Sequence, residues 1–423
     1  MSLLRLAESD TATLAGERGD AARLAMRILV RMAEVSGADH LIDVASAHID
    51  SCLFHGQAGL DFAERLAHAG ARVSVPATLN VSSLDLLHPG LYRGDARTAR
   101  LARRQMDAYV AMGCRPTWTC APYQLPERPL RGQHIAWAES NAIVFANSVL
   151  GARTERYGDF IDICAAITGR VPCAGLHRGE NRRGDVVFDC GKIPQRLFSS
   201  DAFYPVIGHF IGQHTGRSIP VLDGLPPDID EDRLKAIGAA AASSGAVAMF
   251  HAVGSTPEAS SLDAALQGRP ARRTVTVTAA LVRDARDELS TRNEGPLIAV
   301  SLGTPHFSLA EFAALMPLLD GVRFAAGLDV YVSTGRATLA DVESRGWART
   351  LREAGVTIVV DTCTYITPIL RRTQGTVMTN SAKWAYYAPG NLGVDVAFGS
   401  MEECIASAGL GRITRDERLW ADA

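Results

Sequence analysis

The chemistry that this sequence could support centres on two cysteines, each of which follows an apolar run. Cys120 ends a run that reads as a buried strand, and Cys363 closely follows the apolar residues 356–360. Thiolates at strand ends suit zinc or an iron–sulfur cluster, and the two cysteines could share one metal centre. The alternative is that they are unrelated buried thiols, packed as small hydrophobic side chains.

A first group of polar side chains in the N-terminal half also follows short apolar runs: Ser46, His48, Thr78 and Asn80. In a parallel sheet, ligands bind beyond the carboxyl ends of the strands, so we expect this group to lie near Cys120. Each member also has a purely structural interpretation. Ser46 and Thr78 could cap helices, Asn80 could form a turn, and His48 could be a hydrogen-bonded core histidine.

The segment after Cys120 adds further polar candidates. Residues 137–151 are predicted to form a helix that carries Glu139 and Asn141. Arg153 and Arg156 follow it and could bind an anion, although two guanidiniums at a solvated helix end are an equally good interpretation.

A second group of polar side chains follows apolar runs in the last third of the chain: His306, Arg336, Asn380, Ser381 and Lys383. If both halves turn their strand ends toward one central cleft, the two groups would form a single small-molecule site. Lys383 with Asn380 and Ser381 is a reasonable carboxylate clamp. The alternatives are a surface lysine, or a Schiff-base lysine for a pyridoxal cofactor.

The elements that would position these side chains form a regular alternation of helices and strands along the chain. In the N-terminal part the pattern predicts helices at 21–35, 59–68 and 96–112, strands at 41–44 and 72–75, and a strand that ends at Cys120. In the middle it predicts strands at 246–251 and 274–277 and helices at 232–243, 257–266 and 278–289. In the last third it predicts strands at 297–301, 328–333, 356–360, 375–378 and 394–398. Ser308 can cap a helix, and Ser400 with Glu403 matches a capping box. This rhythm indicates an α/β protein with mainly parallel sheets.

The same pattern divides the chain into three predicted domains. Residues 1–198 form a first α/β domain that contains Cys120, and residues 291–423 form another that contains Cys363 and Lys383. Residues 199–290 form a smaller α/β unit that follows the first domain or is inserted into it.

Composition narrows the class of protein. The 423 residues are 47% hydrophobic and carry a net charge of −3 without long runs of one sign, so we expect no nucleic-acid partner and no membrane partner. The N-terminus turns polar too early for a signal peptide, which favours a cytoplasmic location. Eight cysteines without a CxxC pair then indicate metal binding or catalysis rather than disulfides.

Several motifs occur in an order that resembles the large subunit of aconitase X, a branch of the aconitase superfamily. The resemblance runs over nearly the whole length. Its segments are 46–48, 76–80, 120–123, 138–142, 145–153, 208–212, 361–363 and 379–383.

The resemblance implies an aconitase-like fold and an iron–sulfur hydro-lyase. Enzymes of this type bind a cluster through three thiolates and use an open iron as a Lewis acid. Cys120 and Cys363 match two ligand positions, whereas Thr304 occupies the place of the expected third cysteine. The third ligand and the cluster type, 2Fe–2S or 4Fe–4S, therefore stay open. Cys52 and Cys114 are near in sequence, but nothing singles out either.

The resemblance also implies a partner. The family's catalytic serine belongs to a small swivelling domain, which some members carry as a separate small subunit, and we find no such domain in these 423 residues. For this chain we expect dehydration of cis-3-hydroxy-L-proline to a pyrroline-2-carboxylate, with mevalonate 5-phosphate as the alternative substrate. The suggested catalytic residues are His48, Glu139 and Lys383. The suggested substrate contacts are Ser46, Thr78, Asn80, Asn141, Arg153, His306, Asn380 and Ser381. A pyridoxal enzyme and a metal-free scaffold subunit are the competing hypotheses.

Overall fold

The computed structural model describes residues 4–420, and the chain divides into two compact units. Unit 1 comprises Met1–Leu84 and Gly94–Arg183, and unit 2 comprises Asp85–Arg93 and Gly184–Ala423. No helix in the described part of the chain is long and apolar enough to cross a membrane. The predicted division into three domains, with boundaries at residues 198 and 290, stays a prediction.

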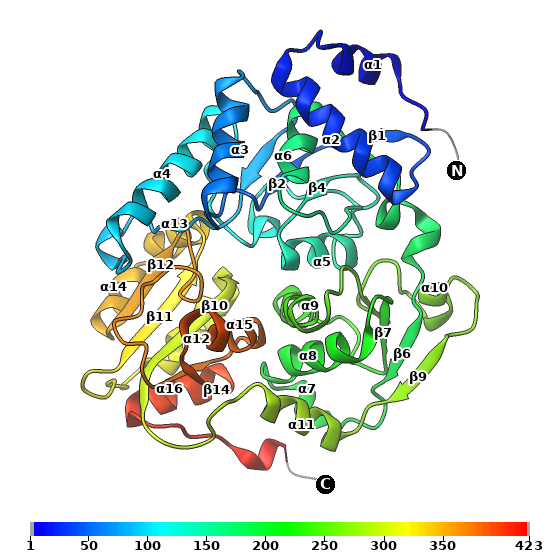
Figure 1. The fold of residues 1–423 in the computed structure, drawn as a ribbon. Coiled ribbons are helices and arrows are strands. Elements are labelled where there is room, and N and C mark those ends of the chain that lie inside the picture. Colours follow the sequence, from blue (N-terminus) through cyan, green and yellow to red (C-terminus); the bar gives the residue numbers. More distant parts are fainter. Residues whose placement is uncertain (1–3, 421–423) are drawn as a thin grey trace. The chain divides into compact units, whose positions relative to one another are not determined.

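Unit 1 is built on a small parallel sheet with the strand order β3-β2-β4 (Figure 1). A second, two-stranded sheet pairs β1 with β5 in antiparallel fashion. The strands are β1 (Leu41–Asp43), β2 (Ala47–Ile49), β3 (Ala77–Leu79), β4 (Ala136–Trp137) and β5 (Arg170–Pro172). The helices are α1 (Glu8–Ala15), α2 (Asp20–Ser36), α3 (Gln57–His68), α4 (Ala96–Ala111), α5 (Ser140–Ser148) and α6 (Ile161–Thr168).

Unit 2 contains two parallel sheets. The four-stranded sheet has the order β8-β7-β6-β9 and the five-stranded sheet the order β12-β11-β10-β13-β14. The strands of the first are β6 (Val186–Asp189), β7 (Pro220–Asp223), β8 (His251–Ala252) and β9 (Arg273–Thr276). Those of the second are β10 (Leu297–Phe307), β11 (Asp329–Thr334), β12 (Val356–Val360), β13 (Thr376–Thr379) and β14 (Asp395–Phe398). The predicted class, α/β with several mainly parallel sheets, is confirmed.

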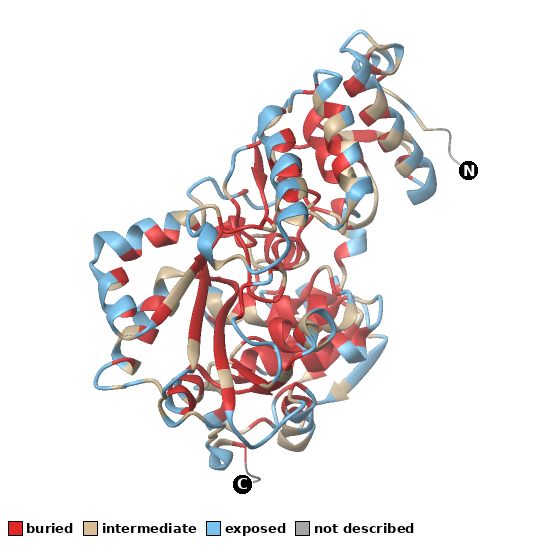
Figure 2. Ribbon diagram, turned by 60° about the vertical axis from the view of Figure 1, so that its left-hand side comes forward, coloured by how far each residue is buried: buried red, intermediate tan, exposed pale blue. Residues whose placement is uncertain are grey.

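The helices of unit 2 cover these sheets, and the strands lie among the buried residues (Figure 2). They are α7 (Gln195–Phe198), α8 (Phe203–Thr215), α9 (Glu231–Gly245), α10 (Leu262–Leu266), α11 (Ala279–Glu288), α12 (Leu309–Leu318), α13 (Arg336–Ser344), α14 (Trp347–Glu353), α15 (Ala382–Leu392) and α16 (Met401–Leu410). The capping boxes at Ser308 and Ser400 are confirmed, each with a glutamate three residues later.

Glycines set the contact between α8 and α9, which lie side by side (Figure 1). A β-carbon on Gly208 would lie 2.8 Å from Ile237 Cα, and one on Gly212 would lie 2.9 Å from Ala241 O. Both distances are shorter than van der Waals contact. The segment 208–212 therefore has a packing role, because only glycine lets the two helix backbones approach this closely.

A buried ion network joins α9 to the start of α12. Lys235 Nζ donates hydrogen bonds to Asp232 Oδ1, at 2.8 Å, and to Glu311 Oε2, and Ser308 Oγ donates to Asp232 Oδ2 at 2.6 Å. Burial raises the pKa of the Glu311 carboxyl to about 7, against the opposing effect of Lys235. Because the lysine side chain is 2% exposed, removing either carboxylate would leave a buried charge poorly compensated.

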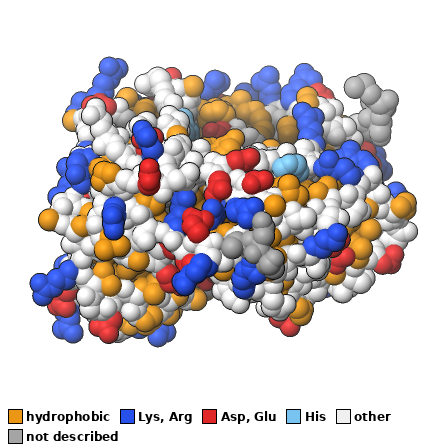
Figure 3. All heavy atoms as spheres, turned by 90° about the horizontal axis from the view of Figure 1, so that it is seen from below, with side chains coloured by type: hydrophobic (Ala, Val, Ile, Leu, Met, Phe, Trp, Pro, Cys, Tyr) orange, Lys and Arg blue, Asp and Glu red, His pale blue; other side chains and the backbone are white. Residues whose placement is uncertain are grey.

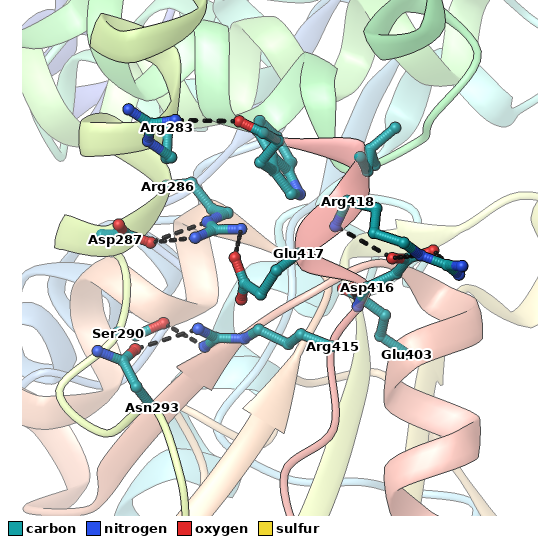
Figure 4. A network of polar contacts seen from close by, with 12 residues as sticks. Arg283, Arg286, Asp287, Ser290, Asn293, Glu403, Arg415, Asp416, Glu417 and Arg418 are labelled. Carbon is teal, nitrogen blue, oxygen red and sulfur yellow. Dashed lines mark hydrogen bonds and ion pairs between the residues drawn. The ribbon is translucent and has the colours of Figure 1, made fainter. Parts of the chain in front are cut away.

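The C-terminal segment is fastened to α11 and to the segment that follows it (Figure 4). Arg415 donates to Ser290 Oγ at 2.7 Å and to Asn293 Oδ1 at 3.1 Å. Arg286 donates to Glu417 Oε2 at 2.8 Å, and its guanidinium lies 5.1 Å from the centre of the Trp420 ring. These contacts hold the last described residues of unit 2 in place.

Charges of both signs are interspersed on the face of the molecule that Figure 3 shows. Arg104 and Glu64, at 2.8 Å, form one of the ion pairs at the surface. Exposed pairs of this kind add little to stability, about 0–1 kcal/mol each. That nucleic acid is not a partner stays a prediction from the charge pattern.

Two predicted strands around the first polar group are wrong. Residues 72–75 form no strand: the backbone NH groups of Val73 and Ser74 donate to Met112 O and Ala166 O, outside the sheet. The run that ends at Cys120 also forms no strand: Trp118 has φ 45°, and Leu79 O accepts from the Thr117 hydroxyl at 2.8 Å and from Thr119 N at 3.2 Å without a continuing ladder. Cys120 therefore lies in a loop.

Other predicted elements are shifted or shortened. The predicted helix 137–151 begins with strand β4 and is helical only over α5, and the predicted helix 257–266 is reduced to α10. The predicted strand 246–251 survives only as β8, because α9 extends to Gly245 and Ala246 adopts the left-handed conformation. The five strands predicted for the last third all exist, and β10 is longer than predicted.

Candidate active-site residues

In unit 1 the first polar group gathers around His48, in the middle of β2. The register pairs His48 with Thr78 of β3 on one side and with Trp137 of β4 on the other. His48 Nδ1 lies 2.8 Å from Thr78 Oγ1, which in turn donates to Ala47 O at 3.4 Å. The contact between His48 Nδ1 and Thr78 Oγ1 fits either tautomer of the ring.

The other ring nitrogen of His48, Nε2, is buried and has no hydrogen-bond partner among residues 4–420. Burial lowers the pKa of His48 to about 4, and the nearby Glu139 carboxylate only partly opposes this effect. The ring is therefore neutral at pH 7. A buried polar nitrogen without a partner is costly, so Nε2 is available for a hydrogen bond with a bound molecule.

Asn80 and Asp50 extend this group. Asn80 Nδ2 donates to Asp50 Oδ1, and Asn80 Oδ1 is buried without a partner in the described part of the chain. Burial, together with the Glu139 charge, raises the pKa of Asp50 to about 7. The sequence prediction missed Asp50, although its place directly after the strand that carries His48 was the available signal.

Glu139 and Asn141 lie at the start of α5. Glu139 caps the helix by accepting from Ala142 N at 2.7 Å. Asn141 Nδ2 donates to Glu139 and to Cys120 O, the latter at 2.7 Å, while Tyr123 OH donates to Asn141 Oδ1 at 2.5 Å. Asn141 thus holds the Cys120 backbone. The Cys120 side chain itself is buried.

The other two candidates of unit 1 lie away from this group. Ser46 precedes β2, and its carbonyl accepts from Ala136 N at 2.9 Å. Arg153 pairs with His134, before the start of β4, and its guanidinium donates to His177 O at 2.9 Å. Both residues lie near the amino ends of the strands, whereas Glu139 follows the carboxyl end of β4. The structure does not bring them together with His48.

In unit 2, Cys363, which follows β12, lies close to His306, near the carboxyl end of β10. Their ligand atoms are within 4.8 Å of each other, and both side chains are buried. His306 Nε2 donates to Thr362 O at 3.1 Å, the residue before Cys363. Asp361 adopts φ 64° and accepts from Arg336 at 2.6 and 2.7 Å, which positions the turn that carries Cys363.

Thr304 lies in β10, two residues before His306, and Ser381 is the N-cap of α15. The Thr304 carbonyl accepts from Ser381 Oγ, and Thr304 Oγ1 is buried without a hydrogen-bond partner among the residues described. Ser381 caps α15 by accepting from Trp384 N at 3.0 Å. Asn380 precedes this cap, and Lys383 lies in the first turn, where it is 5% exposed. Asn380, Ser381 and Lys383 therefore share one helix start.

Family models identify the chain along most of its length. Residues 3–180 match the aconitase X first domain, residues 184–287 the second domain and residues 297–409 the third domain. The chain belongs to the aconitase X family. The predicted resemblance is confirmed.

Relatives within aconitase X fall into two named groups. The chain is 45% identical to cis-3-hydroxy-L-proline dehydratase of Pseudomonas aeruginosa, over 98% of this chain and 72% of that protein. It is 37% identical to the phosphomevalonate dehydratase large subunit of Methanothermobacter thermautotrophicus, over 90% of this chain and 93% of that protein. The name "large subunit" implies that this relative has a small-subunit partner.

A solved aconitase X structure supports the fold assignment. The holo-form from Thermococcus kodakaraensis matches with a TM-score of 0.86 and 32% sequence identity, over 96% of this chain and 100% of that one. The aconitase-like part of the fold prediction is thus confirmed.

Proposed function

We propose that this chain is the large subunit of a hydro-lyase that dehydrates cis-3-hydroxy-L-proline to a pyrroline-2-carboxylate. The observation that carries the proposal is the 45% identity, over 98% of the chain, to a relative with that named activity. Water is lost as the C3 hydroxyl and the proton on Cα, and the resulting enamine tautomerises. The phosphomevalonate relatives are more distant, at 37% identity or less.

We infer that the cofactor is an iron–sulfur cluster and that Cys120, Cys363 and His306 hold it. The donor set fits such a group, because cysteine thiolates and imidazole are its usual protein ligands. In unit 2 a thiol and an imidazole lie within 4.8 Å of each other, and Thr304 supplies no thiol there. Bound iron would supply a Lewis acid that polarises the departing hydroxyl.

His48 and Glu139 are proposed to orient the substrate. The neutral His48 ring offers its unpartnered Nε2 for a hydrogen bond with the substrate, at either the hydroxyl or the ring ammonium. Glu139 is fixed by its own helix cap and supplies negative charge close to His48. Thr78, Asn80 and Asn141 hold these groups in place.

Lys383 is proposed to bind the substrate carboxylate. It is buried in the first turn of α15, where the positive end of the helix dipole favours an anion. The Ser381 hydroxyl is engaged in capping α15 and in bonding Thr304 O, so its contribution is to fix that turn. Asn380 completes the proposed substrate contacts of unit 2. His306 is assigned to the cluster, and Ser46 and Arg153 are given no substrate contact.

The proposed partner is a small subunit that carries the swivelling domain and the catalytic serine. The support is that five relatives with 33–37% identity are named as large subunits, and the chain covers 93–99% of their lengths. We also infer a cytoplasmic location, because all eight cysteines are free thiols.

The phosphomevalonate activity is the second candidate, favoured by this match in length to the large subunits. The deciding experiment co-expresses the chain with its small partner and assays both compounds under anaerobic conditions. We expect turnover of cis-3-hydroxy-L-proline, lost in K383M. Turnover of the phosphate ester alone would overturn cis-3-hydroxy-L-proline as the substrate. An active complex without iron would overturn the assignment of an iron–sulfur cofactor.

A further inference from the structure

Unit 1 contains a pocket that none of the proposed catalytic residues lines. Its volume is about 390 Å³. Its walls come from the start of α3, from the loop after β2, from α4 and from the turn before α6. The residues are 55–59, Ser51, Leu53, Gln105, Asp159 and Phe160.

The first turn of α3 supplies hydrogen-bond donors to this pocket. Its N-cap is Gly56, at φ 141°, and no side chain caps the helix. The first backbone NH groups of a helix have no partner within the helix, so those of Gln57, Ala58 and Gly59 are left for solvent or a ligand. Together with the helix dipole they favour a carboxylate.

Gln105 supplies an acceptor beside these donors. Its Nε2 donates to Ser51 O at 2.8 Å and to Leu53 O at 3.1 Å, which fixes the orientation of the amide. Its Oε1 is buried and has no hydrogen-bond partner within residues 4–420. A β-carbon on Gly59 would lie 3.4 Å from this oxygen, so the acceptor lies directly against the first turn of α3.

The remaining walls carry the exposed imidazole of His55, one negative charge and two apolar side chains. Asp159 is exposed at the rim, and Leu53 and Phe160 are apolar. None of the pocket-lining residues is a lysine or an arginine. A dianion such as a phosphate would be repelled by Asp159. A ligand with one carboxylate, one cationic nitrogen and a small apolar body matches the donors, the acceptors and the walls.

We propose that this pocket binds a small zwitterionic amino or imino acid. Its carboxylate accepts hydrogen bonds from the NH groups of Gln57, Ala58 and Gly59, and its nitrogen donates to Gln105 Oε1 and pairs with Asp159. The inference does not rest on the proposed dehydration. The ligand has two possible sources, the imino acid that the enzyme converts or a separate amino acid that regulates it.

Calorimetric titration of the full chain tests the site directly. The probes are L-proline, which has both charges but no hydroxyl to lose, and cyclopentanecarboxylate, which lacks the nitrogen. We expect L-proline to bind at least about tenfold more tightly than the carboxylate. Equal affinities, or no binding of L-proline, would overturn the proposal.

Three variants test whether L-proline binds in this pocket. A58E places a carboxylate over the helix NH groups at a position where it also favours the helix, and A58Q is its neutral match of equal size. We expect A58E to weaken L-proline binding at least about tenfold and A58Q to weaken it much less. D159N should remove most of the preference for L-proline over cyclopentanecarboxylate. Equal effects of A58E and A58Q, or an unchanged preference in D159N, would contradict the assignment.

Kinetics of the complex with its small partner distinguish the two sources. If the pocket holds the converted imino acid, A58E raises KM for cis-3-hydroxy-L-proline and A58Q does not. If it holds a regulator, A58E leaves KM unchanged and abolishes any effect of added L-proline on the rate. Both results support a zwitterion site, whereas an unchanged KM together with an unchanged L-proline affinity opposes it.

Discussion

His306 Nε2 donates a hydrogen bond of 3.1 Å to the carbonyl oxygen of Thr362, the residue directly before Cys363. This bond fixes the proton on Nε2 and makes Nδ1 the basic nitrogen of the ring. A histidine that binds a metal commonly donates its other NH to a backbone carbonyl in this way. The chain thus has a histidine ligand candidate beside Cys363, where Thr304 offers none.

The His306 assignment predicts a loss of iron when the ring is removed. H306A should lower the iron content of anaerobically purified protein by more than half, because one ligand is missing. T304A should retain the wild-type content, since its hydroxyl binds no iron. Iron per chain can be measured by a colorimetric chelator assay, and equal iron in H306A and wild type would contradict the role of His306.

The two cysteine assignments predict that C120S and C363S abolish the cluster. A hydroxyl is a poor ligand for iron–sulfur iron, so iron, acid-labile sulfide and visible absorbance should fall together. C164S is the matched control, because Cys164 is a fully buried core thiol in α6. Retention of iron in C120S or C363S would remove that residue from the ligand set.

The close approach of α8 and α9 predicts a stability effect. G208A and G212A should each lower the free energy of unfolding by about 1–3 kcal/mol, because the added methyl group meets the opposing backbone. Urea denaturation followed by circular dichroism measures the change. G390A in α15 is the control, since no atom lies within 4 Å of the added carbon. If G208A and G212A are as stable as G390A, the packing explanation is wrong.

The raised pKa of Asp50 predicts a pH dependence of stability. Burial, assisted by Glu139, lifts this pKa from 3.8 to about 7. Between pH 4 and 7 the folded state therefore binds more protons at Asp50 than the unfolded state does, and this group lowers stability as the pH rises.

D50N isolates this effect, because an amide of the same shape does not titrate. Relative to wild type, D50N should gain free energy of unfolding between pH 5 and pH 7.5. Urea unfolding at both values measures the difference between the two proteins. A difference that is equal at the two pH values would mean that Asp50 does not titrate as described.

Local signals made part of this structure predictable. The capping boxes at Ser308 and Ser400 depend on residues three positions apart, so the sequence displays both partners. His48 and Thr78 were expected at neighbouring strand ends, and the structure places them in hydrogen-bond contact. The strands of the last third were predictable because they are continuous apolar runs.

Features that depend on distant partners were not predictable. The sequence pattern places His48 at the end of the run 41–44, but β1 pairs with β5, and His48 lies on the separate strand β2. The loop at Cys120 depends on a bond between the Thr117 hydroxyl and Leu79, 38 residues away. Nor does the sequence reveal that Asp361 and Arg336 together hold the turn before Cys363.

The central claim is tested most directly by the ratio of kcat/KM for two substrates, measured anaerobically on the complex with the small partner. The account predicts that kcat/KM for cis-3-hydroxy-L-proline exceeds that for mevalonate 5-phosphate by at least about 100-fold, because a site built for one polar group rejects a molecule that lacks it. A higher kcat/KM for mevalonate 5-phosphate would contradict it.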